Sequence, residues 1–150
     1  MTDIVDSQKR SEMMSRIRGR DTKPELIVRR IAHRLGFRFR LHRKDLPGCP
    51  DIVFPRYRAV IMVHGCFWHR HPECRYAYTP KTRVRFWQDK FENNVVRDRR
   101  NEVALRELGW RVLVIWECEV NDLGAVEERI EAHLKVPDGR LVETGTRQRP

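Results

Sequence analysis

The sequence predicts one α/β domain in which helices flank a mixed central β-sheet. Apolar residues recur at helical spacing in three segments, and short apolar or alternating segments typical of strands lie between them. A chain of 150 residues is long enough to bury a substantial core. The expected order is one helix, three strands, a second helix, a fourth strand and a third helix, which is typical of a layered α/β domain.

The first expected helix begins at residues 21–25. A capping residue there is followed by Pro24 in the first turn and by Glu25 near the positive helix end. The apolar residues then keep a helical period as far as Gly36, at Leu26, Ile27, Ile31 and Leu35. Residues 37–41 (FRFRL) alternate apolar and basic side chains, as a half-buried strand does.

Two further strands are expected at residues 51–54 and 57–63, after a turn at residues 46–50. The second of them contains the run AVIMV, which is apolar enough for a central strand of the sheet. Residues 64–82 are expected to be irregular, and they contain three of the six histidines, two of the four cysteines and four of the 13 aromatic residues. This density makes the segment a candidate for chemistry that depends on those residue types.

The second expected helix, at residues 83–108, is the longest, and Gly109 ends it. By periodicity Trp87 faces the core. The basic residues of this helix are expected to form a solvated face balanced by Asp89, Glu92 and Asp98. A buried strand at residues 111–116 and an amphipathic helix at residues 122–134 complete the domain.

The chain is strongly basic. Lys and Arg number 31 against 21 for Asp and Glu, which gives a net charge of +10. This excess fits a nucleic-acid partner, or a soluble surface that is merely basic. The expected domain spans residues 21–135, between an arm at residues 1–20 and a flexible tail at residues 136–150. The basic residues of the arm have few acids beside them and fit contacts with DNA phosphates.

No apolar run in the sequence is long enough to span a bilayer, and the N-terminus has no apolar signal segment. We therefore expect a cytoplasmic protein, and we expect it to be a monomer. In the cytoplasm, cysteines are metal ligands or free thiols more often than disulfides.

Four cysteine and histidine residues have the spacing of a metal site. Cys66, His71 and Cys74 form the pattern C-x4-H-x2-C, and Cys118 follows the last expected strand. Such a set suits a closed tetrahedral zinc site, which would be structural because it leaves no position for a substrate. The alternative is that these are buried free thiols, which is our interpretation of Cys49.

Asp51 follows a proline turn and opens a strand whose hairpin partner ends at His64. This layout resembles the PD-(D/E)xK nucleases, in which the second strand carries an acid, a spacer and a lysine. Here Met62 occupies the acid position and His64 the lysine position. Met62 cannot ligate Mg²⁺, which prefers oxygen, but the carbonyl of Val63 could supply one. Alternatively, Asp51 is only a turn residue.

Phe67 and Trp68 are adjacent aromatic residues, and side chains alternate along an extended chain, so one or both could project outward. Exposed aromatic rings in a basic protein can insert between base pairs, whereas the alternative is ordinary packing. His69 is a candidate for proton transfer near neutral pH or a spare zinc ligand.

Five stretches together resemble the very-short-patch repair (Vsr) endonucleases, which recognise T:G mismatches. They keep the order of that family and are RSEMMSRIRGRDTKPE, LPGCPDIVF, VHGCFWHRH, RFWQDKFENNVVRDRR and LGWRVLVIWECE. The resemblance implies a sheet of the restriction-endonuclease type. It implies that Asp51 and the Val63 carbonyl bind catalytic Mg²⁺, with Glu25, His64 and His69 at the active site.

The same resemblance implies structural zinc on Cys66, His71, Cys74 and Cys118. It also matches Phe67, Trp68 and Trp87 to the aromatic residues that insert into DNA beside the mismatch, which replaces the core interpretation of Trp87. Val63 differs from the threonine expected at that position. A carbonyl ligand survives this difference, whereas a role for a hydroxyl would not.

The expected function is a Mg²⁺-dependent, strand-specific endonuclease that nicks double-stranded DNA at T:G mismatches left by deamination of 5-methylcytosine. His69 is the expected proton acceptor. One alternative is a zinc-stapled DNA-binding module without catalysis, and another is a restriction-type endonuclease that acts on unmismatched DNA. The sequence leaves open the flanking bases, an associated methyltransferase and the recruitment of a mismatch-repair partner protein.

Overall fold

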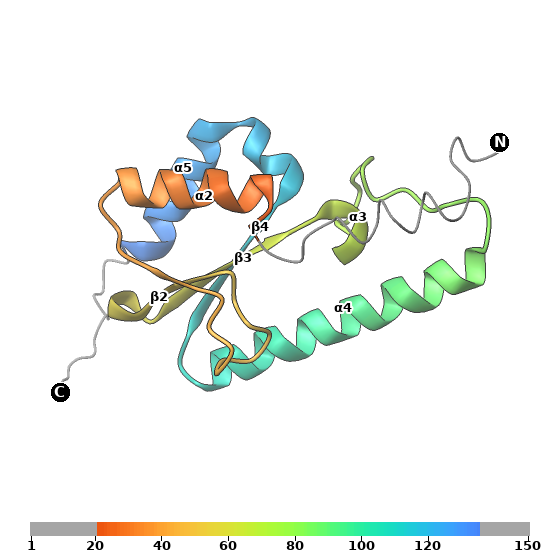
Figure 1. Cartoon of the computed structure of the whole chain (residues 1–150), viewed down its shortest axis with the longest axis horizontal. Coiled ribbons are helices and arrows are strands. Elements are labelled where there is room, and N and C mark those ends of the chain that lie inside the picture. Colours follow the sequence, from red (N-terminus) through yellow and green to blue (C-terminus); the bar gives the residue numbers. More distant parts are fainter. Residues whose placement is uncertain (1–20, 136–150) are drawn as a thin grey trace.

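The computed structural model describes residues 21–135, and it confirms a mixed sheet flanked by helices (Figure 1). The four strands are β1 (Arg40–Leu41), β2 (Ile52–Phe54), β3 (Ala59–His64) and β4 (Arg111–Trp116), in the order β1-β2-β3-β4. The pairs β1/β2 and β2/β3 are antiparallel, and β3/β4 is parallel. The expected arm at residues 1–20 and tail at residues 136–150 lie outside the described residues.

One face of the sheet is covered by α2 (Lys23–Arg34) and α5 (Leu123–Leu134), which lie side by side in Figure 1. Side chains alternate between the two faces along each strand. The face towards α2 and α5 therefore receives every second residue of β2 and β3, namely Ile52, Phe54, Ala59 and Ile61, which pack with Val28 and Ile130. This is the larger part of the core.

The other face of the sheet packs against α4 (Val84–Glu107) through Val53, Val60, Met62, Leu105 and Trp110. A helix of 24 residues is about 36 Å long, so α4 extends well beyond the short strands, as Figure 1 shows. Gly109, with φ 94°, follows the helix and allows the chain to reverse into β4, as the sequence predicts.

The prediction of an irregular segment at residues 64–82 is wrong at its beginning, because α3 (Cys66–His69) forms directly after β3. The N–H of His69 donates to the carbonyl of Gly65 at 3.1 Å. Arg70 then adopts φ 56° and ends the helix. A helix this short has no apolar period that a sequence pattern could reveal.

The first three predicted strands are shorter than expected, and β2 begins at Ile52 rather than at Asp51. Only Arg40 and Leu41 of residues 37–41 pair with β2, and His42 leaves the strand direction with φ 45°. The central strand begins at Ala59 because Pro55–Tyr57 forms a 3-10 turn, η1, and Arg58 has φ 51°. A second 3-10 turn, η2 (Glu117–Asn121), joins β4 to α5. Among residues 21–135, no helix has the length and apolar character needed to cross a membrane.

Candidate active site and metal centre

Two carboxylates from different elements meet where β2 begins. Asp51 precedes β2, and its Oδ2 accepts a 2.8 Å hydrogen bond from the backbone N–H of Val63 on β3. The antiparallel register pairs Ile52 with Ile61, which brings Asp51 beside the end of β3. Glu25 lies in the first turn of α2, where Thr22 caps the helix and accepts from the Glu25 N–H.

Glu25 is 2% exposed and is surrounded by donors. Its Oε1 accepts from the Asp21 N–H at 2.7 Å and from Arg29 at 3.2 Å, and it lies 3.3 Å from Nε2 of His42. Sequence reasoning missed Arg29 and His42. The spacing of Arg29 four residues after Glu25 could have indicated an ion pair, whereas His42 comes from another part of the chain.

Burial and the neighbouring Glu25 carboxylate raise the pKa of Asp51 well above its ordinary value. Two carboxylates that share a buried site resist ionising together unless a cation compensates their charge. The oxygen atoms of Asp51 and Glu25, with the adjacent Val63 carbonyl, are the kind of donor that Mg²⁺ prefers. The residues present therefore fit a hard divalent cation.

His64 and His69 form a stacked pair beside these carboxylates. Their ring centroids are 4.0 Å apart and the interplanar angle is 7°. His69 Nδ1 lies 2.6 Å from Oδ2 of Asp98 on α4. Burial, together with the nearby His69, lowers the pKa of His64 to about 4, so the His64 ring is neutral near pH 7.

Asp98 is therefore a site residue, and the expectation that it only balances basic residues of α4 is wrong. Its carboxylate is paired with His69 rather than with an arginine of the helix. Nothing in the local sequence indicated this, because the partner lies in a distant segment and on another element. In the neutral form of the His69 ring in which Nδ1–H donates to Asp98, Nε2 is the acceptor.

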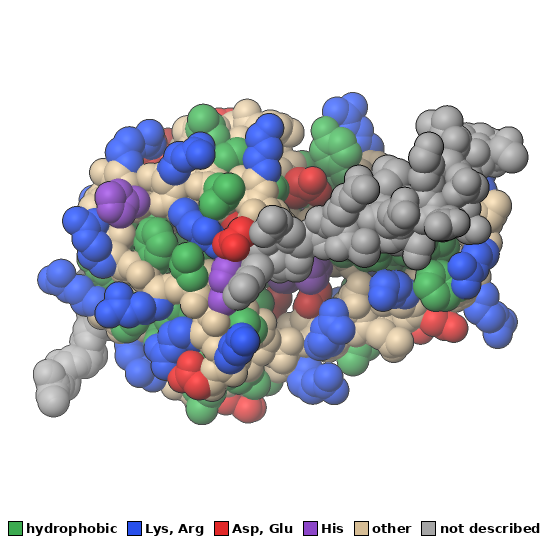
Figure 2. Space-filling view, in the orientation of Figure 1, with side chains coloured by type: hydrophobic (Ala, Val, Ile, Leu, Met, Phe, Trp, Pro, Cys, Tyr) green, Lys and Arg blue, Asp and Glu red, His purple; other side chains and the backbone are tan. Residues whose placement is uncertain are grey.

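Two adjoining cavities open beside the histidine pair, with volumes of about 680 and 390 Å³. Glu25, Trp68 and Lys90 line the larger cavity, and Asp51 and Asp98 line the smaller. Residues that line both are Val63, His64, His69 and Arg97. Figure 2 shows histidine and acidic side chains gathered near the centre of this face, with Lys and Arg around them.

A second cluster contains the four predicted zinc ligands. One ligand atom from each of Cys66, His71, Cys74 and Cys118 lies within 4.8 Å of every other. Nδ1 of His71 is 3.7 Å from Sγ of Cys66 and 3.4 Å from Sγ of Cys118. Burial raises the pKa of the Cys66 thiol to about 12, so metal binding there would release protons.

Thiolate and imidazole donors in this number fit a closed tetrahedral zinc site. The cluster joins α3 and the loop after it to η2, which carries Cys118. His69 instead belongs to the group formed with His64 and Asp98, so the geometry does not favour it as a spare zinc ligand. Cys49 is a free cysteine outside the cluster, as the sequence indicates.

Phe67 lies at the centre of an aromatic cluster formed by Phe67, Trp68, Tyr78, Trp87 and Phe91. Its ring centroid is 4.9 to 5.6 Å from the centroids of the other four. Trp87 is 8% exposed, so its ring would have to leave this packing to insert into DNA, whereas Phe67 and Trp68 are half-buried. The carbonyl of Trp68 accepts a 3.0 Å hydrogen bond from Asn94 on α4.

Paired carboxylates at the start of a hairpin, on a mixed sheet flanked by helices, define an endonuclease-like domain of the restriction-endonuclease type. The catalytic domain of the homing endonuclease I-Bth0305I has a similar fold, with a TM-score of 0.52. The similarity covers 75% of this chain and 94% of that domain at 22% sequence identity, and it supports the fold alone.

The chain belongs to the DNA mismatch endonuclease Vsr family, whose pattern matches residues 2–75. Type II nicking enzyme V.XorIIP from Xanthomonas oryzae pv. oryzae is 53% identical over 87% of this chain and 95% of its own length. DNA mismatch endonuclease Vsr from Escherichia coli is 47% identical over 79% of this chain and 75% of its own length. The predicted family and the predicted enzyme class are confirmed, which favours an endonuclease over a binding module without catalysis.

Proposed function

We propose that this protein nicks one strand of double-stranded DNA at T:G mismatches and that the reaction depends on Mg²⁺. The observation that carries the proposal is the buried Asp51 and Glu25 pair beside the His64 and His69 stack. A DNA-binding protein without catalytic activity would not need two buried carboxylates whose negative charges repel each other. Two of the similar proteins are a DNA mismatch endonuclease and a nicking enzyme, which supports the same reaction class.

Asp51 and the Val63 carbonyl are the residues that would hold Mg²⁺, and Glu25 would position water or phosphate beside them. When bound, Mg²⁺ supplies a positive charge that stabilises the developing charge on the phosphate and lowers the pKa of a bound water. Lys90 and Arg97 line the same cavities and add positive charge that attracts a phosphate before any bond changes.

His69 is the proposed proton acceptor for the attacking water. Asp98 holds the proton of the neutral ring on Nδ1, which leaves the Nε2 lone pair free. In the reaction, the water oxygen bonds to phosphorus, its proton passes to Nε2, and one phosphate ester P–O bond breaks as the leaving oxygen takes a proton from water. The neutral His64 ring stacks on His69 and limits its orientation.

We propose further that Cys66, His71, Cys74 and Cys118 hold a structural zinc ion. Phe67, Trp68 and Trp87 are proposed to read the mismatch by inserting next to it. A T:G wobble pair stacks less well than a Watson–Crick pair, so opening the stack beside it costs less. The Asn94 hydrogen bond to Trp68 ties this cluster to α4, which also carries Asp98.

The test uses paired labelled duplexes, T:G and C:G, incubated with Mg²⁺ and the full chain, and resolves the products by strand. Nicking of the T strand in the T:G duplex alone is the expected result. Equal cutting of both duplexes would favour a restriction-type activity on unmismatched DNA. Asp51→Ala is the matched inactive control, because it removes a metal carboxylate and leaves the aromatic cluster in place. Monomeric state, cytoplasmic location and recruitment of a mismatch-repair partner protein stay predictions.

A further inference from the structure

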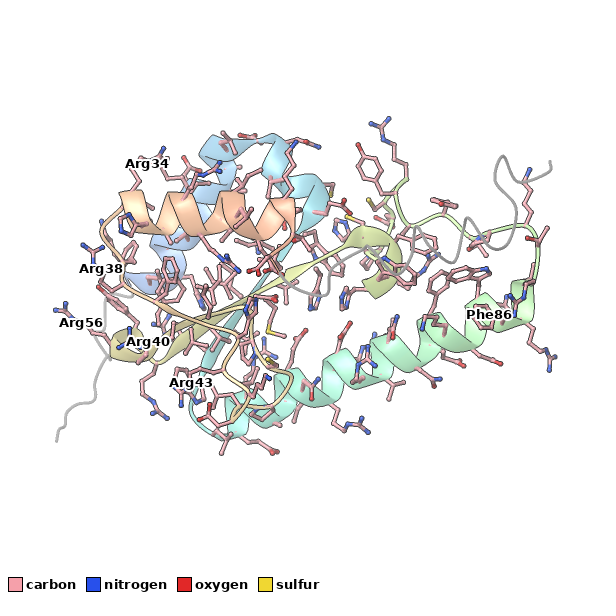
Figure 3. All side chains as sticks on the ribbon, viewed as in Figure 1. Arg34, Arg38, Arg40, Arg43, Arg56 and Phe86 are labelled. Atoms are coloured by element: carbon pink, nitrogen blue, oxygen red, sulfur yellow. The ribbon has the colours of Figure 1, made fainter. Side chains whose placement is uncertain are left out.

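Three exposed arginines lie together at the sheet edge, away from the aromatic cluster: Arg38, Arg40 and Arg56. Arg40 belongs to β1, and Arg38 precedes it by two residues in the same extended segment. Phe37 and Phe39 pack on the core and alternate with Arg38 and Arg40, so these two arginines point outward. Figure 3 shows all three at the end of the molecule opposite Phe86. We call these three residues the arginine row.

Strand pairing explains why Arg56 joins the row although it comes from another segment. The antiparallel register pairs Arg40 with Val53, so the chain that precedes Arg40 lies towards the end of β2, where Phe54 is followed by Pro55. Pro55 begins η1, and Arg56 follows it directly. The fold therefore collects three arginines at one edge of the sheet.

The charges of the arginine row are not compensated by carboxylates. Within residues 21–135, none of the three guanidinium groups has an acidic partner at ion-pair distance, and Arg56 lies only over the ring of Tyr57. Nearby arginines differ, since Arg34 pairs with Glu127 at 2.8 Å and Arg43 pairs with Asp45 at 2.6 Å. Unpaired like charges at one edge produce a positive potential that a polyanion would neutralise.

The arginine row begins beside the catalytic carboxylates. Directly after β1 the chain turns at His42, whose Nε2 is 3.3 Å from Oε1 of Glu25 and whose backbone N–H donates to the Asp51 carbonyl at 3.3 Å. At about 3.3 Å per residue, Arg40 and Arg38 lie roughly 7 and 13 Å along the chain from His42. The row thus leads away from the cut site in the direction opposite to the aromatic cluster.

We propose that the arginine row binds the phosphate backbone of the DNA duplex on the side of the cut site away from the aromatic cluster. This inference rests on the proposed function, because it takes the duplex to be held at Asp51 and Glu25. Guanidinium groups bind phosphate through paired hydrogen bonds and keep their charge at every relevant pH. Continuity with the cut site favours DNA over an acidic protein surface as the occupant.

The experiment measures DNA affinity of the full chain against salt concentration, without added Mg²⁺, so that no cleavage occurs. The variant is Arg38→Gln/Arg40→Gln/Arg56→Gln. The control is Arg75→Gln/Arg100→Gln/Arg106→Gln, which removes the same charge from exposed positions elsewhere. Each protein binds two T:G duplexes, one extended by a helical turn on one side of the mismatch and one extended on the other side.

For one of the two extensions, the row variant should lower the slope of log affinity against log salt by about 3, roughly one for each lost phosphate contact. The other duplex should show no more change than it does with the control, which should affect both duplexes equally. All three side chains are exposed, so the variant should keep the parental melting temperature.

Parental slopes on both duplexes would overturn the proposal and would fit an acidic protein partner instead. An equal loss on both duplexes, matched by the control, would also overturn it, because it would indicate only a general charge effect. Failure of the proposed function can be distinguished from failure of this inference. If the parent protein does not nick T:G duplexes, the proposed function is wrong, but the salt dependence of affinity could still differ between the two extended duplexes.

Discussion

At the residue scale, His69 is constrained from two directions. Its Nδ1 is 2.6 Å from Asp98, and its ring face lies on His64 at a centroid distance of 4.0 Å. The first contact selects the tautomer and the second selects the ring plane. Asp98 does not need to touch the substrate to matter, since it acts through the orientation and basicity of His69.

Asp98→Asn should therefore slow nicking while leaving DNA affinity near the parental value. The amide keeps the shape of the carboxylate but can no longer favour the Nδ1–H tautomer. General bases contribute about a hundred- to ten-thousandfold to rate, and losing the orientation of one should cost roughly ten- to a thousandfold. The measurement is the single-turnover nicking rate on a T:G duplex.

A double variant distinguishes this positioning role from a role in stability. If Asp98 acts through His69, then His69→Ala/Asp98→Asn should be no slower than His69→Ala alone. If the double variant nicks more slowly than His69→Ala alone, Asp98 contributes independently of His69, and its assignment as a positioning residue is wrong.

His133 provides a pH-dependent contribution to stability that is separate from the active site. Burial, followed by the positive charge of Arg111, lowers its pKa to about 4 from an ordinary 6.5, and its Nε2 lies 3.2 Å from the Val60 carbonyl. A neutral ring donates Nε2–H to that oxygen. The unfolded chain binds a proton near pH 6.5, whereas the folded chain binds it only near pH 4.

The contribution of His133 is therefore fully present above pH 6.5 and is lost as the pH falls to about 4. A shift of this size corresponds to at most about 3 kcal/mol. We expect the free energy of unfolding to fall less between pH 7 and pH 5 in His133→Gln than in the parent. Urea unfolding at both pH values tests this, and identical pH dependence in the two proteins would refute it.

At the element scale, patterns that repeat within one segment predicted the fold well. The expected helix at residues 83–108 is α4 (Val84–Glu107), because a long apolar period and a terminal glycine are both local signals. The strand at residues 111–116 is β4 within the same bounds. Short elements were less predictable, because α3 contains four residues and β1 only two.

The site residues also differ in whether a local sequence pattern points to them. Asp51 and the four cysteine and histidine residues of the second cluster were candidates from local patterns, and their roles stay predictions. Asp98, Arg29 and His42 were not candidates, because each acquires its role from a partner brought by the fold. Asp98 meets His69 across 29 positions of sequence, and His42 meets Glu25 across 17.

The segment after β3 should depend on metal for its order. Apart from its aromatic contacts, the loop after α3 is held by Arg70, which donates to the carbonyls of Ala77 and Tyr78 and lies 3.8 Å from the ring centroid of Phe91. The Cys66, His71, Cys74 and Cys118 cluster fastens the same segment to η2. Removing the one distant ligand should free one end of that attachment.

Cys118→Ser should therefore lose bound zinc and lower the melting temperature by about 10 °C or more, since structural zinc contributes directly to folding. Metal analysis and thermal melting measure the two effects. Cys49→Ser is the matched control, because Cys49 is a free cysteine outside the cluster. A Cys118→Ser protein with one equivalent of zinc and the parental melting temperature would show that the zinc site is misassigned.

At the scale of the whole molecule, the aromatic cluster, the arginine row and α4 lie around the candidate active site. The aromatic cluster lies on one side, the arginine row leads away on the other, and α4 carries both Asp98 and the Asn94 contact to Trp68. The residues proposed to read the mismatch and those proposed to act in catalysis are therefore attached to the same helix. A change in the position of the aromatic rings should reach His69 through α3 and α4 without altering the basic surfaces.

Trp68→Ala tests this division between reading the mismatch and holding DNA. General affinity comes mainly from phosphate contacts, so it should keep its steep salt dependence in the variant. Aromatic stacking on an opened base is worth about 1–3 kcal/mol, and its loss should slow nicking of a T:G duplex by roughly five- to a hundredfold or more. Nicking rate and salt-dependent affinity are measured on T:G and C:G duplexes, with Val103→Ala as the control because Val103 is an exposed apolar residue of α4 outside the aromatic cluster. Parental nicking by Trp68→Ala, or equal loss of affinity for both duplexes, would separate Trp68 from mismatch recognition.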